Sequence, residues 1–122
     1  MARALLACGA LAMALGVAAG AFAAHAARGA PHPDAGELLR TAVLYHLVHG
    51  LAIVAAGLAA RWGTSAWLAA SGALFLAGIA LFCGSLWLLA MTGRSAGAFA
   101  PAGGLAFIAG WICLAVHALR AP

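Results

Sequence analysis

Charge is scarce in this chain. Only eight of its 122 residues carry a charged side chain, lysine is absent, and six arginines stand against two carboxylates. About a quarter of the residues of a soluble protein are charged, so a water-soluble fold of this size could not cover its surface. The 67% hydrophobic content and the mean hydropathy of +1.11 therefore predict an integral membrane protein that lies in a lipid bilayer.

The few charges and thiols also exclude several classes of function. The arginines are spaced singly and form no basic face, so nucleic-acid binding has no support. Cys8, Cys83 and Cys113 fall inside apolar runs without metal-ligand spacing, and we expect them to be packing residues. The chain offers no nucleophile dyad and no carboxylate pair for catalysis. We therefore predict a protein that is not an enzyme and that holds no cofactor or metal.

Long uncharged runs set the fold class. They cover residues 4–27, 41–60, 62–93 and 95–119, which are 24, 20, 32 and 25 residues long. A helix needs about 20 apolar residues to cross a bilayer, so each run predicts one span. We expect an all-α membrane protein: a four-transmembrane-helix bundle with short loops, forming a single membrane domain over residues 1–122. The predicted helices cover about 3–25, 34–60, 66–91 and 101–119.

The last predicted helix has an alternative start. Pro101 is tolerated in a first helical turn, which favours a beginning near that residue. A span that begins at Phe99 and is kinked around Pro101, Gly103 and Gly104 is the other possibility.

The first helix carries two further signals. Gly16 and Gly20 form a small-x-x-x-small pair, which lets another helix backbone approach closely and predicts a contact within the bundle. The first 26 residues also resemble a secretory signal, with Arg3 before an apolar run and Ala-x-Ala at 21–23 or 24–26. The apolar run exceeds a signal core of about 7 to 15 residues, so a retained span is the preferred interpretation.

Asp34 and Glu37 are the only carboxylates, and their spacing predicts a helix cap. Asp34 stands at the expected start of the second helix, and Glu37 three residues later matches a capping box. Acidic residues in a first turn also suit the positive end of the helix dipole. We therefore assign both carboxylates a structural role.

The arginines do not fix the orientation in the membrane. Four spans place both termini on one side. The six arginines divide equally, with Arg3, Arg61 and Arg120 on that side and Arg28, Arg40 and Arg94 on the other. The amino terminus near Arg3, and the two acids on the opposite side, favour termini in the cytoplasm.

Polar residues in the second helix form the candidate site. Thr41, Tyr45 and His49 recur every four residues and so share one helix face, with His49 near mid-membrane. A polar side chain at that depth normally turns inward to a partner and is a functional candidate. It can form an interhelical hydrogen bond, or it can bind metal or haem or carry protons. His25 and His46 lie toward the same side of the membrane, so up to three imidazoles can converge.

Four segments together resemble a known family. They are residues 16–25 (GVAAGAFAAH), 42–49 (AVLYHLVH), 81–93 (LFCGSLWLLAMTG) and 100–111 (APAGGLAFIAGW). In this order they are similar to the small four-span family related to transmembrane protein 256, catalogued as domain of unknown function 423. The resemblance implies an all-helical membrane protein of about this length and brings no established activity, substrate or cofactor.

The resemblance also selects positions. Family members share an Ala-His at the end of the first helix, here Ala24-His25, and a Tyr-x-x-x-His in the second, here Tyr45 to His49. This chain has Ala-Ala-His-Ala where the family commonly has Gly-Ala-His-Gly, and it has His46 where the family has a non-histidine. His25 and His49 are therefore the positions carried over, and His46 becomes less important.

Three functions remain open from the sequence. The preferred one is a non-catalytic helical scaffold or accessory subunit that forms a homo-oligomer or binds a membrane-protein partner, because the turns are short and small-residue faces abound. The alternatives are a small carrier or channel with a polar path along Thr41, Tyr45 and His49, and haem or metal ligation by His25 and His49. Abundant Ala, Gly and Arg without lysine are typical of a GC-rich genome and favour a bacterial inner membrane.

Overall fold

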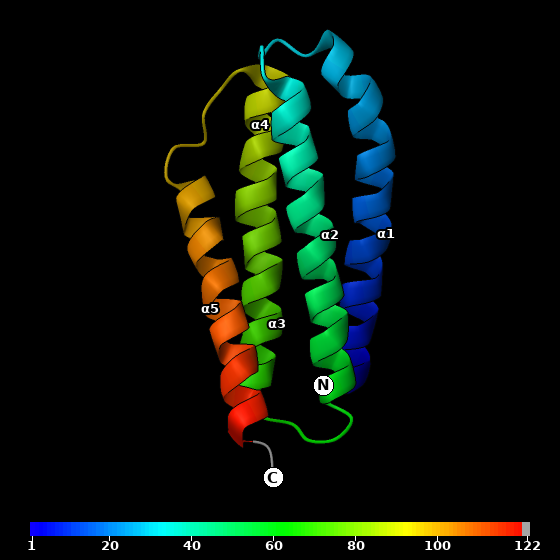
Figure 1. Ribbon diagram of the computed structural model, residues 1–122, viewed down its shortest axis with the longest axis vertical. Helices are drawn as coiled ribbons and strands as arrows, with labels where there is room; N and C mark the ends of the chain where they lie inside the picture. The colour runs from blue at the N-terminus through cyan, green and yellow to red at the C-terminus, as the bar shows by residue number, and fades with distance from the viewer. Residues whose placement is uncertain (121–122) are drawn as a thin grey trace.

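The computed structural model describes residues 1–120 as a bundle of four long helical spans that run up and down in sequence order (Figure 1). The elements are α1 (Ala2–Ala26), the 3-10 turn η1 (Ala27–Gly29), α2 (Ala35–Ala59), α3 (Ala66–Gly78), the π-helical turn η2 (Ile79–Cys83), α4 (Gly84–Thr92) and α5 (Phe99–Arg120). No strand occurs among these residues. The predicted all-α class and four-helix bundle are confirmed.

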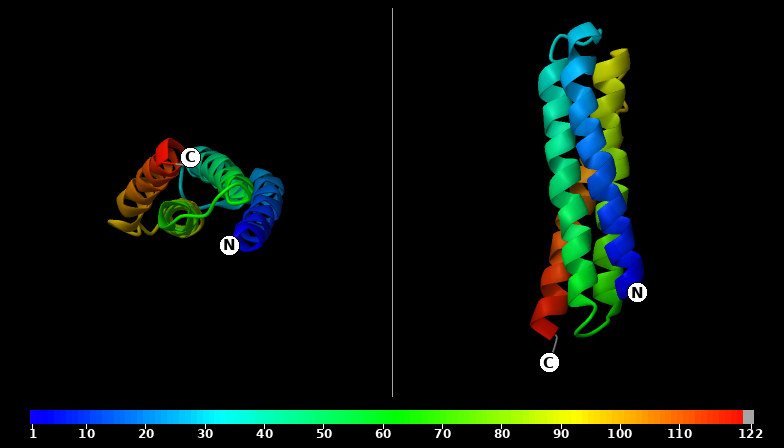
Figure 2. Two further views of the ribbon diagram at one scale, coloured as in Figure 1. Left: turned by 90° about the horizontal axis from the view of Figure 1, so that it is seen from below. Right: turned by 90° about the vertical axis from the view of Figure 1, so that its right-hand side faces the viewer.

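All four spans are long and apolar enough to cross a bilayer. With η1 counted in the first span, and with α3, η2 and α4 counted together as the third, they contain 28, 25, 27 and 22 residues. The start of α1 and the end of α5 lie at the same end of the bundle as the turn between α2 and α3 (Figure 2). The last helix begins at Phe99, two residues before the preferred prediction and at the alternative start, with Pro101 inside its first turn.

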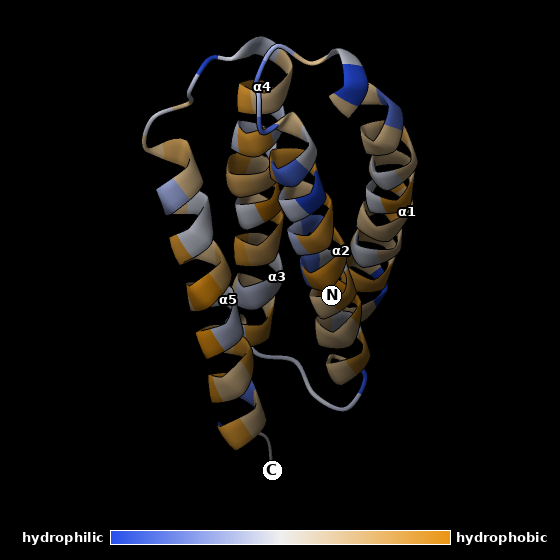
Figure 3. Cartoon of the chain, turned by 45° about the horizontal axis from the view of Figure 1, so that its top comes forward, coloured by the Kyte–Doolittle hydropathy of each residue, from blue (hydrophilic) through white to orange (hydrophobic). Residues whose placement is uncertain are grey.

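Apolar side chains cover the long sides of the bundle. Figure 3 shows that residues of high hydropathy dominate the spans, whereas the hydrophilic residues gather mainly at the two ends. Large apolar side chains such as Leu11, Leu15, Leu51 and Leu105 point outward and are more than half exposed. A surface of this kind suits hydrocarbon, where the backbone polar groups must be paired within each helix.

Glycines bring α1 and α2 into close contact. A Cβ atom at Gly16 would lie 2.8 Å from the side chain of Leu47, and one at Gly9 would lie 2.7 Å from the backbone nitrogen of Val54. Any larger residue would push the two helices apart. Gly20 lies on the same seam, so the predicted contact of Gly16 and Gly20 within the bundle is confirmed.

A second seam joins the third span to α5, and there glycines face phenylalanines. Gly78 faces the ring of Phe107, and Gly110 faces the ring of Phe75, which a Cβ atom would approach to 2.6 Å. Phe75 and Phe107 belong to the main buried cluster together with Ile53 of α2. Each large ring therefore fills the space that a missing side chain leaves on the opposite helix.

The third span is not the uninterrupted α-helix that the sequence predicts. Residues Ile79–Cys83 form a π-helical turn between α3 and α4. Such turns are rare and occur frequently at functional sites. The span ends as expected at Gly93, which adopts a φ of 69° and donates its N–H to the carbonyl of Leu89 across 2.8 Å.

The predicted capping box of Asp34 and Glu37 is wrong. Asp34 does precede α2, but its side chain accepts no capping hydrogen bond, and its φ of −99° and ψ of 22° depart from the extended backbone usual for such a cap. Its N–H donates to Nδ1 of His32 across 3.1 Å, so Glu37 does not take that donor. Backbone hydrogen bonds to the Asp34 carbonyl, from the amides of Glu37 and Leu38, close the first turn instead.

Candidate functional site

His49 lies near the middle of α2 and is buried against the third span and α5. Only 4% of its surface is exposed. Its ring stacks on that of Phe107 with 3.5 Å between centroids and an interplanar angle of 13°, and the ring of Phe75 lies 5.6 Å away. His49 therefore points into the bundle, as predicted.

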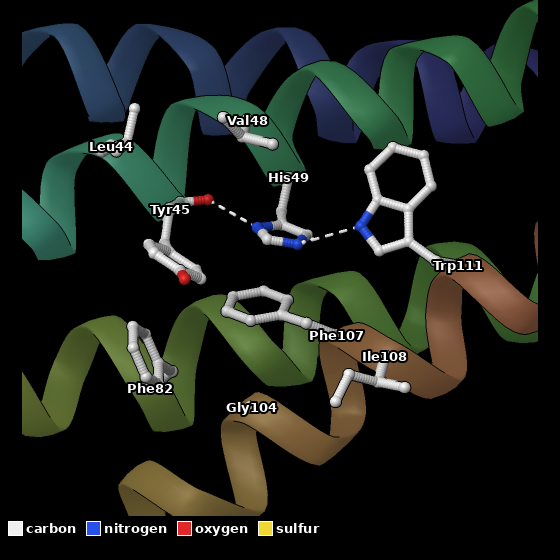
Figure 4. A pocket seen from close by; sticks show the side chains of 9 residues that line it. All are labelled: Leu44, Tyr45, Val48, His49, Phe82, Gly104, Phe107, Ile108 and Trp111. Atoms are coloured by element: carbon white, nitrogen blue, oxygen red, sulfur yellow. Dashed lines mark hydrogen bonds between the residues drawn. The ribbon is translucent and has the colours of Figure 1, made fainter.

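Both ring nitrogens of His49 have partners (Figure 4). The indole Nε1–H of Trp111 donates to Nε2 across 3.2 Å. Because an indole can only donate, Nε2 must be the nitrogen without a proton. Nδ1 then carries the proton and donates it to the backbone carbonyl of Tyr45 across 2.8 Å.

This pair of hydrogen bonds defines a neutral ring in one tautomer. The lone pair of Nε2 points to the indole of Trp111, and the proton of Nδ1 is taken by a carbonyl of the same helix. A metal or haem iron would need one of these nitrogens as a free ligand. As arranged, His49 links α2 to α5 and has no nitrogen left for another group.

Tyr45 lies one turn from His49 and faces a groove. The residue is 40% exposed, and its ring lies 4.8 Å from the ring of Phe82 and 6.0 Å from that of Phe107. Its hydroxyl has no hydrogen-bond partner among residues 1–120. Thus the first and last members of the Tyr-x-x-x-His motif differ, because His49 is fully bonded whereas Tyr45 keeps a free donor.

The groove runs between α2 and α5 and has a volume of about 560 Å³. Side chains of α2 form one wall and side chains of α5 form the other, with Phe82 of the π-turn below (Figure 4). The lining residues are Leu44, Tyr45, Val48, His49, Phe82, Gly104, Phe107, Ile108 and Trp111. Leu44 and Val48 of α2 and Ile108 of α5 form its rims, and each of these side chains is more than two-fifths exposed. The groove therefore opens sideways toward the lipid.

Thr41 lies in a separate hollow nearer the end of the bundle. This hollow has a volume of about 320 Å³, and its lining residues are Asp34, Glu37, Leu38, Thr41, Phe82 and Leu86. Phe82 lines both the hollow and the groove. The predicted stripe of Thr41, Tyr45 and His49 therefore follows α2 from the carboxylates to the buried imidazole.

His25 does not join this site. The register of α1 against α2 places Ala27 beside Gly36, with 3.9 Å between Cβ positions. His25 is then level with residue 38, which is eleven residues from His49 or about 16 Å along the helix axis. Its side chain is also exposed. Ligand nitrogens must lie about 2 Å from one metal ion, so joint haem or metal ligation by His25 and His49 is wrong.

His46 has more importance than the sequence suggested. Its Nε2 bonds to the carbonyl of Ala12 across 2.9 Å and so links α2 to α1. Because a carbonyl only accepts, Nε2 is the protonated nitrogen here. His46 and His49 therefore fasten α2 to two different helices, and the three imidazoles do not converge.

The sequence analysis missed the groups of α5 and the third span that complete the site. Trp111 lies deep in an apolar span, away from the interfaces where tryptophan is usual, and a buried indole N–H normally finds a partner. That combination was the available signal for a bond to a histidine of another helix. Phe82 and Phe107 gave no such signal, because nothing distinguishes them from other apolar residues in their spans.

Comparisons with known proteins agree with this architecture. Residues 19–104 match the family model described as protein of unknown function DUF423. The chain is similar to the UPF0382 membrane protein YwdK of Bacillus subtilis, with 40% identity over 92% of this chain and 93% of the relative. It is also similar to the UPF0382 inner membrane protein YgdD of Escherichia coli, with 35% identity over 85% of this chain and 80% of the relative. No solved structure matches the chain.

Proposed function

The chain belongs to the DUF423 family of integral membrane proteins, and we propose that it acts as a non-catalytic accessory subunit of the membrane. The observation that carries this proposal is the complete pairing of His49 by Tyr45 and Trp111. The imidazole of His49 serves as a link between α2 and α5, and the site offers no nucleophile or carboxylate beside it. The hydrogen bonds that hold the two helices together then account for the presence of His49 in the span.

We further propose that the groove between α2 and α5 receives a transmembrane helix of a membrane-protein partner. The groove follows the two helices lengthwise, over one turn of α2 from Leu44 to Val48 and about two turns of α5 from Gly104 to Trp111. An elongated groove with aliphatic rims accepts a row of side chains from a neighbouring helix. Gly104 gives that neighbour room, since a Cβ atom there would have no contact within 4 Å.

Site-specific photocrosslinking in native membranes tests this proposal. A photoreactive residue at Ile108, on the groove rim, should give a discrete protein adduct, whereas the same residue at Leu15 on the outer face of α1 should not. Gly104→Leu should fill the groove and remove the adduct. Gly84→Leu is the matched control, because a Cβ atom at Gly84 also has no contact within 4 Å but lies outside the groove.

The adduct also identifies the occupant. An adduct of twice the chain mass identifies a second copy of this chain, and an adduct of another mass identifies a different subunit. If the groove position yields lipid adducts alone, or if Gly104→Leu leaves the protein adduct unchanged, the proposed accessory role through this groove is contradicted.

A second function, a small carrier, has one observation in its favour. The hollow at Glu37 and Thr41 and the groove at Tyr45 share Phe82 as a lining residue, and polar side chains of α2 follow one another from the end of the bundle toward its middle. Replacing His49 by Leu separates the two functions. Loss of flux in reconstituted vesicles with assembly intact would favour transport, whereas lost assembly without a change in flux would favour the accessory role.

A further inference from the structure

A polar hollow lies at the end of the bundle opposite to Asp34 and Glu37. It has a volume of about 290 Å³ and is formed where the turn between α2 and α3 meets the last turn of α5. Its principal lining residues are Trp62, Thr64, Ser65, Trp67, His117 and Arg120. This hollow shares no residue with the groove of the proposed function.

His117 is the buried polar group of this hollow. It is 9% exposed, and its Nδ1 lies 2.9 Å from Oγ of Ser65. Oγ of Ser65 already accepts the N–H of Leu68 across 3.2 Å, as the cap of α3. The Ser65 hydroxyl keeps one proton to donate, and Nδ1 of His117 is the acceptor that lies within reach.

The position of the proton on His117 follows from the direction of its bond with Ser65. If Nδ1 accepts from Ser65, Nε2 carries the proton of the neutral ring. Nε2 of His117 has no hydrogen-bond partner among residues 1–120, and His117 lines the hollow. In that arrangement, His117 presents an N–H donor to a group bound in the hollow.

The remaining groups of the hollow also favour an anion. The guanidinium carbon of Arg120 lies 5.6 Å from the ring centre of Trp67, which holds the cation against one wall. The N-terminus of α3 also attracts negative charge, although the amide of Leu68 is already capped by Ser65. Arg3 and Arg61 lie at this same end, whereas both carboxylates of the chain lie at the start of α2.

We propose that this hollow binds the phosphoryl group of an anionic phospholipid, with Arg120 and Nε2–H of His117 as its donors. The hollow lies at the ends of the spans, where headgroups lie in a bilayer, and Trp62 and Trp67 flank it as interfacial residues do. Basic pockets between transmembrane helices bind phosphate-bearing headgroups in this way. A free phosphate ion has the same chemistry and is the other source of such a group.

Native mass spectrometry of the protein in a maltoside detergent tests the proposal. The wild-type protein should retain one dioleoyl phosphatidylglycerol and should not retain dioleoylglycerol, which lacks the phosphoryl group. Arg120→Gln should weaken retention about tenfold, as loss of one charge-assisted contact does, and Arg120→Lys should restore part of it. Arg94→Gln, which removes an arginine at the other end of the bundle, is the matched control and should leave retention unchanged.

Two further arms complete the test. His117→Phe should weaken lipid retention as well, and circular dichroism checks that this variant keeps its helices. If this buried substitution unfolds the protein, the result for the exposed Arg120→Gln variant still tests the proposal. Competition by millimolar inorganic phosphate would support the phosphoryl site and name free phosphate as its source, whereas its failure to compete favours the lipid. Equal retention of phosphatidylglycerol by wild type, Arg120→Gln and Arg94→Gln would overturn the proposal.

Discussion

Trp111 of α5 donates its indole N–H to Nε2 of His49 of α2 across 3.2 Å, and this bond joins two residues that lie 62 positions apart in the sequence. The same imidazole stacks on Phe107, so a hydrogen bond and a ring contact both hold α2 against α5. The open groove lies on the outer side of these contacts. The link therefore sets the spacing of the two groove walls.

A double-mutant cycle of His49→Leu and Trp111→Phe should measure this link. We expect a coupling free energy of about 0.6 kcal/mol, the average for interhelical hydrogen bonds in membranes. Each single variant should lose more than this, because it also leaves a polar partner unpaired. The unfolding free energy in bicelles is the measurement, and a coupling of zero would show that the bond contributes nothing.

Gly78 should be intolerant of any side chain. A Cβ atom there would overlap the ring of Phe107, on which His49 stacks. We expect Gly78→Ala to destabilise the protein by about 1 to 3 kcal/mol. Gly104→Ala is its control and should stay within about 0.5 kcal/mol, because its position is open. Thermal unfolding in detergent compares them, and equal midpoints would contradict the described seam.

Ser65 should contribute to the stability of α3. Its hydroxyl accepts the N–H of Leu68 and bonds His117, so Ser65→Ala removes a helix cap worth about 1 kcal/mol. Ser95→Ala is a suitable control, because Ser95 bonds the amide of Gly97 in an exposed loop. Chemical unfolding in micelles should separate the two variants. Equal stability would mean that the cap of α3 has no energetic effect.

Four spans place the loop ends Gly29 and Gly97 on one side of the membrane and Gly63 on the other. In a background without the native cysteines, an impermeant maleimide added to spheroplasts should label Gly29→Cys and Gly97→Cys alike. Gly63→Cys should show the opposite accessibility. A Cβ atom at Gly29, Gly63 or Gly97 would have no contact within 4 Å. Gly97 has a φ of 58°, so Gly97→Cys adds local backbone strain in its exposed loop, but the spans on either side keep their apolar residues. Matching accessibility for all three would contradict a four-span topology.

The spans were predictable because they depend on local composition. Each uncharged run contains at least the roughly 20 residues that a bilayer requires. The face shared by Thr41, Tyr45 and His49 was also predictable, since residues four apart on a helix always align. These features follow from neighbours in sequence.

The partners of these residues were not predictable, since they depend on how helices pack. The depth of Trp111 indicated a donor that needs a partner, but nothing in the sequence pairs it with His49 in particular. Nothing near His25 indicates that its side chain points outward. The π-turn at Ile79–Cys83 has no pattern of apolar residues that would distinguish it from an α-helix. At Asp34 the capping pattern was present, but His32 accepts the amide proton that Glu37 was expected to receive.

The central claim is that His49 is a structural link with both nitrogens occupied. Nitrogen NMR of the protein in lipid bilayers, with labelled histidine, reports directly which ring nitrogen carries the proton. We predict a neutral ring protonated at Nδ1, with Nε2 as an acceptor whose signal shifts in Trp111→Phe. A proton on Nε2, or an Nε2 signal that is unchanged in Trp111→Phe, would contradict the account.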